Sequence, residues 1–254
     1  MDGIEWARAK YNYLGKTWCK MMEGFAMYTS SRIICDAEAV YEVIRKRHRR
    51  RPPHSVIEYG APLIDDSLHT DILEHYGIKE REYYLIVCRM EPENHVTEIL
   101  KGFAASDSKL PLIILGNVSA ETPYVKELLT IKDPRIRFVG TLFEHEKLQH
   151  LRRASLAYFH GHSVGGTNPS LIEALGCGNV VVAHDNEFNR EVAAESAFYF
   201  GDFDSIPEII NKIENDDSVD LEAMRRGAKK RIADHYTWEI ITDKYLKLLE
   251  SYKK

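Results

Sequence analysis

The sequence predicts an α/β fold, with one complete doubly wound parallel sheet and a partial second α/β domain before it. From Tyr83 onward, short and nearly continuous apolar runs alternate with helix-like segments, as in strands covered by helices on both faces. Such alternation forms βαβ units, which give a parallel sheet with right-handed crossovers. The first 70 residues hold only two strand-like runs, too few to close a sheet-based domain.

The N-terminal part is expected to run helix, strand, helix, strand. The patterns place these elements at Tyr11–Tyr28, Ser31–Cys35, Ala37–Arg47 and Ser55–Tyr59. Gly60-Ala61-Pro62 and the polar stretch after it are typical of a linker. Because two strands leave open sheet edges, we expect both to lie at an exposed edge or to be covered by another chain.

The main domain is expected to be a Rossmann-like sheet. Its apolar runs are rich in Val, Ile, Tyr and Phe and lie at residues 83–88, 111–116, 136–140, 156–161, 179–184 and, more weakly, 197–201. Helix-like stretches between them lie at His95–Ala105, Thr122–Thr130 and Glu144–Arg153.

Two helices are expected at the C-terminal end. Asp220 is a suitable N-cap for Leu221–His235, and Thr237 for a last helix. The last helix has apolar residues at helical spacing, which we expect to pack rather than to bind a ligand: Trp238, Ile241, Tyr245, Leu248 and Tyr252.

Composition and charge exclude several classes of protein. Hydrophobic residues make up 44% and charged residues 29% of the chain, which excludes collagen-like, coiled-coil and wholly disordered chains. No apolar run approaches the roughly 20 residues of a membrane helix, and no secretory signal is visible. The net charge of −5 and the lack of a recognised motif predict that no nucleic acid is bound.

One segment is strongly basic. Arg45–Arg51 reads RKRHRRR, which places six of the 34 Lys and Arg residues in seven positions. Two interpretations stay open: the solvated end of a helix that runs into Pro52-Pro53, or a patch for anionic lipid headgroups or a phosphate-bearing acceptor. The second predicts peripheral contact with the inner membrane surface.

The four cysteines are scattered, with no CxxC pair or Cys/His cluster, so a structural zinc site is not expected. Cys35 and Cys88 lie in apolar runs and are expected to be small buried side chains. This cysteine usage favours a reducing compartment, and the predicted location is the cytoplasm.

Ligands of open parallel sheets bind beyond the carboxyl ends of the strands, so the residues after each run bear on function. Small or polar residues recur there, at Arg89, Gly116-Asn117, Gly140-Thr141, His160–Thr167 and His184-Asp185. This recurrence is weak as a signal by itself, because βα loops need turn residues in any case.

The fourth of these loops is more specific. Gly165-Gly166 would let a ligand approach the backbone, Asn168 is a good N-cap, and Pro169 suits the first helical position. The N–H groups and dipole of such a helix favour a diphosphate in front of it. Glu173, about one turn further in, could accept hydrogen bonds from a ribose diol, and the alternative is an exposed helix carboxylate.

Arg89 is the expected partner for the same diphosphate, since a guanidinium is permanently charged and can grip two oxygens. The alternative is a surface ion pair with Glu91 or Glu93. Neither GxxxxGK nor GxGxxG is present, and no DxD-like carboxylate pair stands in a suitable loop. We therefore expect neither a metal ion nor a cofactor.

Two segments together resemble a known family. Arg89–Asn94 reads RMEPEN, and Gly165–Gly178 reads GGTNPSLIEALGCG. They resemble the C-terminal domain of family 4 glycosyltransferases, which have the GT-B fold. The opening Asp2–Arg8, DGIEWAR, is similar to a DGLEW-type segment in the N-terminal domain of the rhamnosyltransferase-like branch. The similarity covers nearly the whole chain.

The resemblance implies a glycosyltransferase that moves a hexosyl or deoxyhexosyl unit, rhamnosyl in this branch, from a nucleoside diphosphate sugar to a glycan or lipid-linked acceptor. It implies retention at the anomeric carbon, no metal, and a place in surface polysaccharide synthesis. By match of motif, Arg89 would hold the diphosphate and Glu173 the ribose, as the catalytic pair. Further residues would contact the donor: Asn94, Gly116, Thr141, Leu142, Gly165, Gly166, Thr167, Asn168, Ser170 and Leu171.

The chain departs from the family pattern. The family carries two glutamates with seven residues between them, and here the first falls on Gly165, while an expected basic residue falls on Asn94. The family also places a full acceptor-binding domain first, whereas this chain begins in its later part. The expected organisation is a partial acceptor-side domain (residues 1–70), a donor-binding domain (71–236) and a C-terminal helix that crosses back (237–254).

A hypothesis from another class stays open: a non-catalytic module that binds the nucleotide sugar but needs the absent N-terminal strands or a partner to act. A homo-oligomer that covers the incomplete sheet would supply such a partner. A nucleotide-sugar epimerase with the same two-domain plan is a remoter alternative, since no carboxylate pair is clearly placed for proton abstraction.

Overall fold

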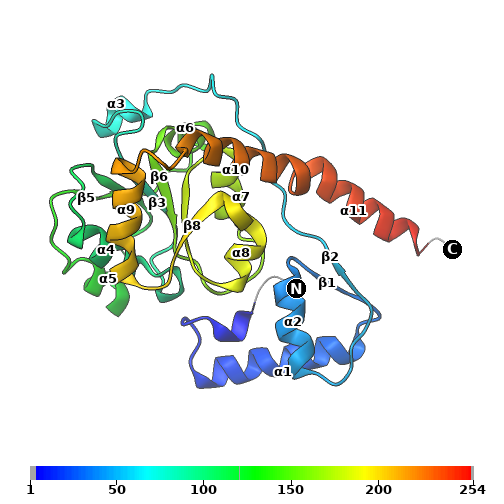
Figure 1. Ribbon diagram of the computed structural model, residues 1–254. Helices are drawn as coiled ribbons and strands as arrows, with labels where there is room; N and C mark the ends of the chain where they lie inside the picture. The colour runs from blue at the N-terminus through cyan, green and yellow to red at the C-terminus, as the bar shows by residue number, and fades with distance from the viewer. Residues whose placement is uncertain (1–3, 120, 253–254) are drawn as a thin grey trace.

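The computed structural model describes residues 4–119 and 121–252, so Asp2 and Gly3 of the DGIEWAR segment lie outside the described residues. It contains two parallel sheets, one of two strands and one of six. Figure 1 shows the larger sheet between layers of helices, with the N-terminal part below it. The predicted α/β fold, with one complete doubly wound sheet beside a smaller α/β part, is confirmed.

The N-terminal part is built around the two-stranded sheet. Its elements are η1 (Glu5–Ala7), α1 (Tyr13–Thr29), β1 (Ile33–Cys35), α2 (Glu38–Arg47) and β2 (His54–Val56). β1 and β2 pair in parallel, with Ile33 opposite His54 and Cys35 opposite Val56. The order helix, strand, helix, strand is as predicted, although β2 is shorter than the predicted strand.

The larger sheet is parallel throughout and has the strand order β5-β4-β3-β6-β7-β8. Its strands are β3 (Tyr84–Val87), β4 (Leu112–Leu115), β5 (Ile136–Gly140), β6 (Ala157–His160), β7 (Val181–His184) and β8 (Ala197–Phe200). The chain adds β4 and β5 on one side of β3 and then places β6 on the other side. The loops after β3 and β6 therefore diverge and leave a crevice at this switch point.

Helices cover both faces of this sheet because successive strand side chains point to opposite faces. Leu85 belongs to a core shared with α3, α6, α7, α8 and α10, and Ile86 to a core shared with α4, α5 and α9. The helices are α3 (Ile72–Tyr76), η2 (Pro92–Asn94), α4 (Val96–Ala105), α5 (Pro123–Leu128), α6 (His145–Ala154), α7 (Pro169–Gly176), α8 (Glu187–Ala193), η3 (Ala194–Ser196), η4 (Phe203–Ser205), α9 (Ile206–Asn215), α10 (Leu221–His235) and α11 (Trp238–Glu250).

The N-terminal part packs against the loop before α7 and against α8. Phe188 of α8 is buried in the same apolar cluster as Met27, Val40 and Ile44 of the N-terminal part. The carboxylate of Glu191 accepts hydrogen bonds from two backbone N–H groups of α2, at 2.8 and 2.9 Å. These contacts bring the N-terminal part to the edge of the crevice.

The last helix, α11, extends from the sheet domain along the N-terminal part (Figure 1). Lys244 pairs with Glu58 at 2.5 Å, and Arg32 Nε donates to the hydroxyl of Tyr252 at 2.9 Å. The prediction that its apolar face packs is wrong for most of that face: Ile241 is buried, but Trp238, Tyr245 and Tyr252 are exposed. A single small N-terminal part offers too little surface to cover a whole helix stripe.

Two further observations concern side chains and helices predicted above. Cys35 is fully buried, as expected, whereas Cys88 is only partly buried at the end of β3. Within residues 4–119 and 121–252, no helix is both long enough and apolar enough to cross a membrane.

Candidate active site

The crevice at the switch point holds three adjoining cavities, of about 540, 170 and 140 Å³. Arg89, which follows β3, lines all three, so they form one continuous site. Its side chain is 60% exposed and lies 3.4 Å from a carboxylate oxygen of Glu91. The ion pair with Glu91 is thus formed, and the guanidinium still faces the crevice.

The 540 Å³ cavity lies between the loops after β3, β4 and β5. The predicted residues Gly116, Thr141, Leu142 and Ser170 line it. A Cβ on Gly116 would come within 2.2 Å of a methionine methyl group and 2.4 Å of a backbone carbonyl, so only glycine fits there. The cavity is wide, shallow and mostly apolar, which suits a nucleoside.

Phe143 is a lining residue that sequence analysis missed. Its side chain is 91% exposed at the rim of the 540 Å³ cavity. An exposed aromatic ring beside such a cavity can stack on a planar base. The signal was present in the sequence as an apolar residue directly after the predicted Thr141-Leu142 loop.

The 170 Å³ cavity is formed by the glycine loop between β6 and α7. The predicted residues Gly165, Gly166, Thr167 and Asn168 line it. Gly165 has a φ of 136°, in the region that favours glycine. Asn168 caps α7 as predicted, since its side-chain oxygen accepts a hydrogen bond from the Ser170 N–H at 2.9 Å. The positive end of the α7 dipole therefore faces this cavity.

Three residues of the N-terminal part complete the 170 Å³ cavity: Arg8, Asp36 and Tyr59. A Cβ on Gly166 would lie 2.4 Å from Asp36 Oδ1, so glycine leaves room for that carboxylate. The hydroxyl of Thr167 donates to the backbone carbonyl of Asp36. Sequence analysis did not anticipate these neighbours, because more than a hundred residues separate them from the glycine loop.

Asn94 positions the groups around the 140 Å³ cavity. Its Nδ2 donates to the backbone carbonyl of Arg89 at 2.7 Å, and its Oδ1 lies 2.8 Å from Nδ1 of His162. Asn94 is buried. It therefore holds the loop after β3 against the loop after β6, in addition to lining the site.

The histidines of this crevice are neutral at pH 7. Burial lowers the pKa of His162 to about 4, and the positive charges of Arg8 and Arg89 act in the same direction. Burial and then the neighbouring His95 lower the pKa of His184 to about 4, and burial holds that of His160 well below its ordinary value. Arginines and the α7 terminus thus supply the positive potential.

Glu173 is held by a buried arginine. Arg152 Nη1 lies 2.5 Å from Glu173 Oε2, and the side chains are 2% and 32% exposed respectively. Arg152 Nη2 also donates to Ser170 Oγ at 3.2 Å, and the Tyr158 hydroxyl lies 2.6 Å from the same oxygen. Glu173 is therefore neither a freely exposed carboxylate nor part of the lining of the three cavities.

Leu171 is the one predicted donor-binding residue that points away from the site. It is fully buried in the core beneath α7. Its neighbour Ser170 lines two of the cavities, because adjacent helix residues face different directions.

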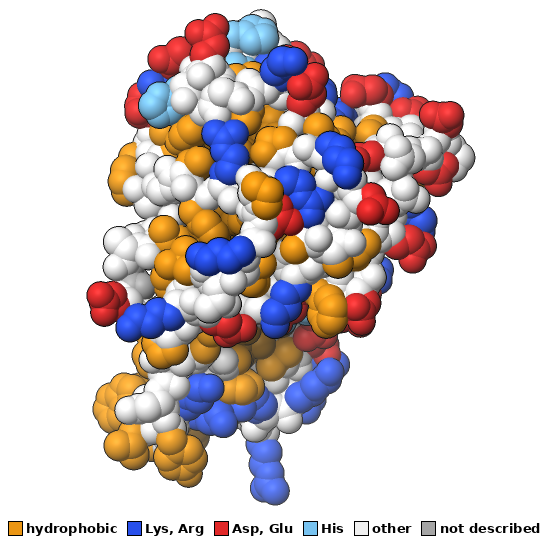
Figure 2. Space-filling view, turned by 90° about the vertical axis from the view of Figure 1, so that its left-hand side faces the viewer, with side chains coloured by type: hydrophobic (Ala, Val, Ile, Leu, Met, Phe, Trp, Pro, Cys, Tyr) orange, Lys and Arg blue, Asp and Glu red, His pale blue; other side chains and the backbone are white. Residues whose placement is uncertain are grey.

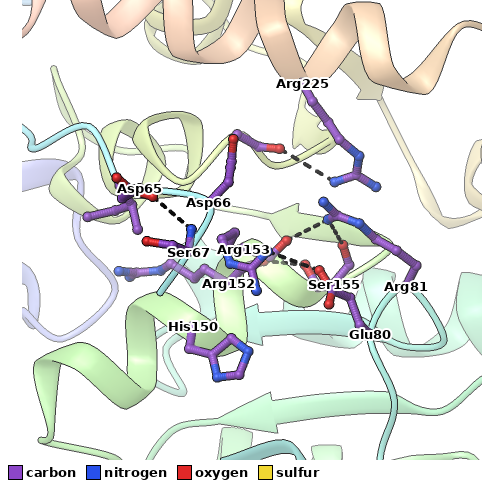
Figure 3. Close-up of polar contacts among 12 residues, drawn as sticks. Asp65, Asp66, Ser67, Glu80, Arg81, His150, Arg152, Arg153, Ser155 and Arg225 are labelled. Carbon is purple, nitrogen blue, oxygen red and sulfur yellow. Dashed lines mark hydrogen bonds and ion pairs between the residues drawn. The ribbon is translucent and has the colours of Figure 1, made fainter. Parts of the chain in front are cut away.

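A second polar cluster lies at the opposite end of the strands. Figure 3 shows Arg81, Arg153 and Ser155 in contact there. Arg81 Nη1 donates to the Ser155 carbonyl at 2.9 Å, and Arg153 pairs with Glu80 at 3.0 Å. Because Arg81 is used on backbone carbonyls and Arg153 on a carboxylate, this cluster ties the loops before β3 and β6 together.

The described part of the chain contains no group of three or more His, Cys, Asp or Glu side chains arranged to hold a metal ion. The charge available to neutralise a diphosphate in the crevice comes from its arginines and from the α7 terminus.

Solved structures share this fold. HepE of Anabaena in complex with UDP superposes with a TM-score of 0.79 at 17% identity, over 95% of this chain and 69% of HepE. A glycosyltransferase of Rickettsia africae gives 0.77 at 14%, over 92% and 67%. Sucrose-phosphate synthase of Thermosynechococcus elongatus gives 0.77 at 16%, over 98% and 65%. The chain thus spans about two thirds of the length of these proteins.

A comparison with curated proteins gives no match. The sequence pattern of the family described as glycosyl transferases group 1 matches residues 70–231, which is more than half of the chain. That range contains the six-stranded sheet, Arg89, the glycine loop and α7. The chain therefore belongs to the glycosyl transferases group 1 family, a family of transferases with the GT-B-type fold.

Proposed function

We propose that this protein transfers a hexosyl or deoxyhexosyl unit, rhamnosyl in the first instance, from a nucleoside diphosphate sugar to a glycan or lipid-linked acceptor. The reaction is metal-independent, retains the anomeric configuration, and serves surface polysaccharide synthesis on the cytoplasmic side of the membrane. The observation that carries the donor class is that Arg89 lines all three cavities of the crevice, in front of the N-terminus of α7.

The geometry assigns a part of the donor to each cavity. The nucleoside occupies the 540 Å³ cavity, beside Gly116, Thr141 and Leu142. The diphosphate lies at Arg89, and the sugar extends into the 170 Å³ cavity at the glycine loop. Negative charge develops on the diphosphate as the glycosidic bond breaks, and a fixed guanidinium with a helix terminus stabilises that charge in the transition state.

Nucleotide binding is the first test, with Phe143 as its probe. Isothermal titration calorimetry is carried out with UDP, GDP, ADP and TDP; UDP comes first because HepE carries it. At least one of them is expected to bind. Phe143→Ala is expected to weaken that binding about 5- to 50-fold, since stacking on a base contributes roughly 1–3 kcal/mol. Phe25→Ala, an equally exposed phenylalanine on α1, is the matched control and should bind as the parent does.

Two results would contradict the donor class. One is a parent chain that binds none of the four diphosphates. The other is a Phe143→Ala variant that binds as tightly as the Phe25→Ala control, which would remove the base from the 540 Å³ cavity.

The exposed face of α1 supports a second candidate, in which the chain binds the donor but transfers sugar only when another polypeptide, such as a second copy, covers α1. Seven large apolar side chains of this helix are exposed: Tyr13, Leu14, Trp18, Met21, Met22, Phe25 and Tyr28. Figure 2 shows hydrophobic side chains gathered on the lower, N-terminal part of the molecule. Donor turnover by the purified monomer would exclude this candidate.

Peripheral membrane contact is proposed through Arg45–Arg51. Arg47 and His48 are held by Glu23, at 3.0 and 2.8 Å, whereas Arg49, Arg50 and Arg51 are exposed. Sedimentation with vesicles that contain anionic lipid is expected to carry down the parent. The triple change of Arg49, Arg50 and Arg51 to Glu should abolish it, since each basic residue contributes about 1 kcal/mol near such a surface. Equal sedimentation with neutral vesicles would argue against this contact.

A further inference from the structure

We infer that Arg8, from the N-terminal part, is a second phosphate-binding arginine that grips the distal phosphate of the nucleoside diphosphate donor. The inference rests on the proposed function and adds to it a binding residue outside the matched family range of residues 70–231. It also assigns the N-terminal part a role in holding the donor.

The first argument is position. Arg8 and Arg89 line the same 170 Å³ cavity, Arg8 from the N-terminal part and Arg89 from the end of β3. Arg89 also lines the nucleoside-sized cavity, whereas Arg8 does not. A ligand that starts in the larger cavity passes Arg89 first and meets Arg8 beyond it. The group it presents to Arg8 is the phosphate further from the nucleoside.

The second argument is charge. His162 in this cavity is neutral, because burial and then the charges of Arg8 and Arg89 lower its pKa. The side-chain cations that line the cavity are therefore the two guanidiniums. The terminal phosphate of a nucleoside diphosphate carries more than one negative charge near pH 7, and two arginines suit it better than one.

The third argument is that Arg8 is held in place but can release its present partner. Its side chain is 14% exposed, and Nε lies 2.8 Å from a carboxylate oxygen of Glu5. Glu5 has two other contacts, Lys10 at 3.5 Å and the Tyr11 hydroxyl at 3.2 Å. When Arg8 turns to a phosphate, Glu5 keeps these partners, so the exchange leaves no carboxylate unpaired.

The segment that carries Arg8 is anchored on α1. Trp6 Nε1 donates to Glu23 at 2.8 Å, and the guanidinium of Arg47 lies 4.1 Å from the centre of the Trp6 ring. A side chain placed by a packed neighbour loses little conformational entropy on binding. Arg8 is therefore pre-positioned over the glycine loop.

The test compares a diphosphate with its monophosphate. Calorimetry is carried out with UDP and UMP on the parent, Arg8→Gln and Lys10→Ala; if another base binds more tightly, that diphosphate and its monophosphate are used. Arg8→Gln is expected to weaken diphosphate binding about 10- to 100-fold, as the loss of a charge-assisted hydrogen bond predicts. Monophosphate binding should change less than twofold. Lys10→Ala removes the other cation beside Glu5, outside the cavity, and should leave both affinities as in the parent.

Each remaining outcome overturns the inference in a recognisable way. If Arg8→Gln binds the diphosphate as the parent does, Arg8 does not contact the distal phosphate. If it weakens the monophosphate and the diphosphate equally, the effect is a general one of charge or folding, and a thermal denaturation curve shows which. A parent that binds no nucleotide overturns the proposed function and this inference with it.

Discussion

Replacing Glu173 with alanine is expected to lower the free energy of unfolding by about 3 kcal/mol or more, which is the cost of leaving a buried charge without its partner. The reason is Arg152 rather than Glu173 itself. The Arg152 side chain is 2% exposed, and Glu173 supplies the only carboxylate that pairs with it in the described part of the chain. Urea denaturation measures the change.

The same physics predicts a rescue. Arg152→Met removes the buried charge and keeps most of its volume, and Glu173, at 32% exposed, can then be solvated. The double change Arg152→Met with Glu173→Ala is therefore expected to recover most of the stability that Glu173→Ala loses. The control is Glu208→Ala, whose exposed pair with Lys212 should contribute less than about 1 kcal/mol. Equal losses for Glu173→Ala and Glu208→Ala would refute the role of Arg152.

This pair also bears on the proposed ribose contact. Arg152 holds Oε2 of Glu173, and Oε1 has no hydrogen-bond partner among the described residues. A carboxylate fixed by one oxygen is presented in one orientation with the other oxygen open to a diol. Loss of nucleotide affinity in Glu173→Ala alone would mix folding with binding, so the stable double variant is the informative one.

The sheet was predictable because its signal is local. The runs that became β3 to β7 are nearly continuous in apolar residues, and each lies within two residues of the observed strand. Helix α9 carries an equally local signal, since Ile206, Ile209, Ile210 and Ile213 recur at helical spacing and are buried. It could have been predicted, whereas the five residues of α3 in the expected linker carry too short a pattern.

The site was predictable only in part, because it depends on contacts between distant segments. Arg89, Gly116 and Gly165-Gly166 follow strands, so the switch-point rule brings them together without knowledge of the fold's details. Arg152 is polar and therefore reads as a solvent-facing helix residue. Its spacing of four from Leu148, which packs against the core, is the one signal that it faces inward.

Replacing Arg89 with alanine is expected to weaken nucleoside diphosphate binding about 100-fold or more, since a guanidinium can donate two charge-assisted hydrogen bonds to phosphate. Arg89 is the residue shared by all three cavities, so its loss affects every phosphate of the donor. Its side chain is 60% exposed, so stability should change by less than about 0.5 kcal/mol. Calorimetry and urea denaturation on the same sample measure both quantities.

The ion pair of Arg89 with Glu91 allows the two roles of this arginine to be separated. If Arg89 only pairs with Glu91, then Glu91→Gln and Arg89→Ala should have the same small effect on binding. If Arg89 binds the diphosphate, Glu91→Gln removes a competing carboxylate and should leave affinity unchanged or raise it. Arg190→Ala is the matched control, because Arg190 is an exposed arginine paired with Asp185 after β7 and outside the three cavities. Affinity lost equally in the Arg89 and Arg190 variants would mean that general surface charge attracts the nucleotide.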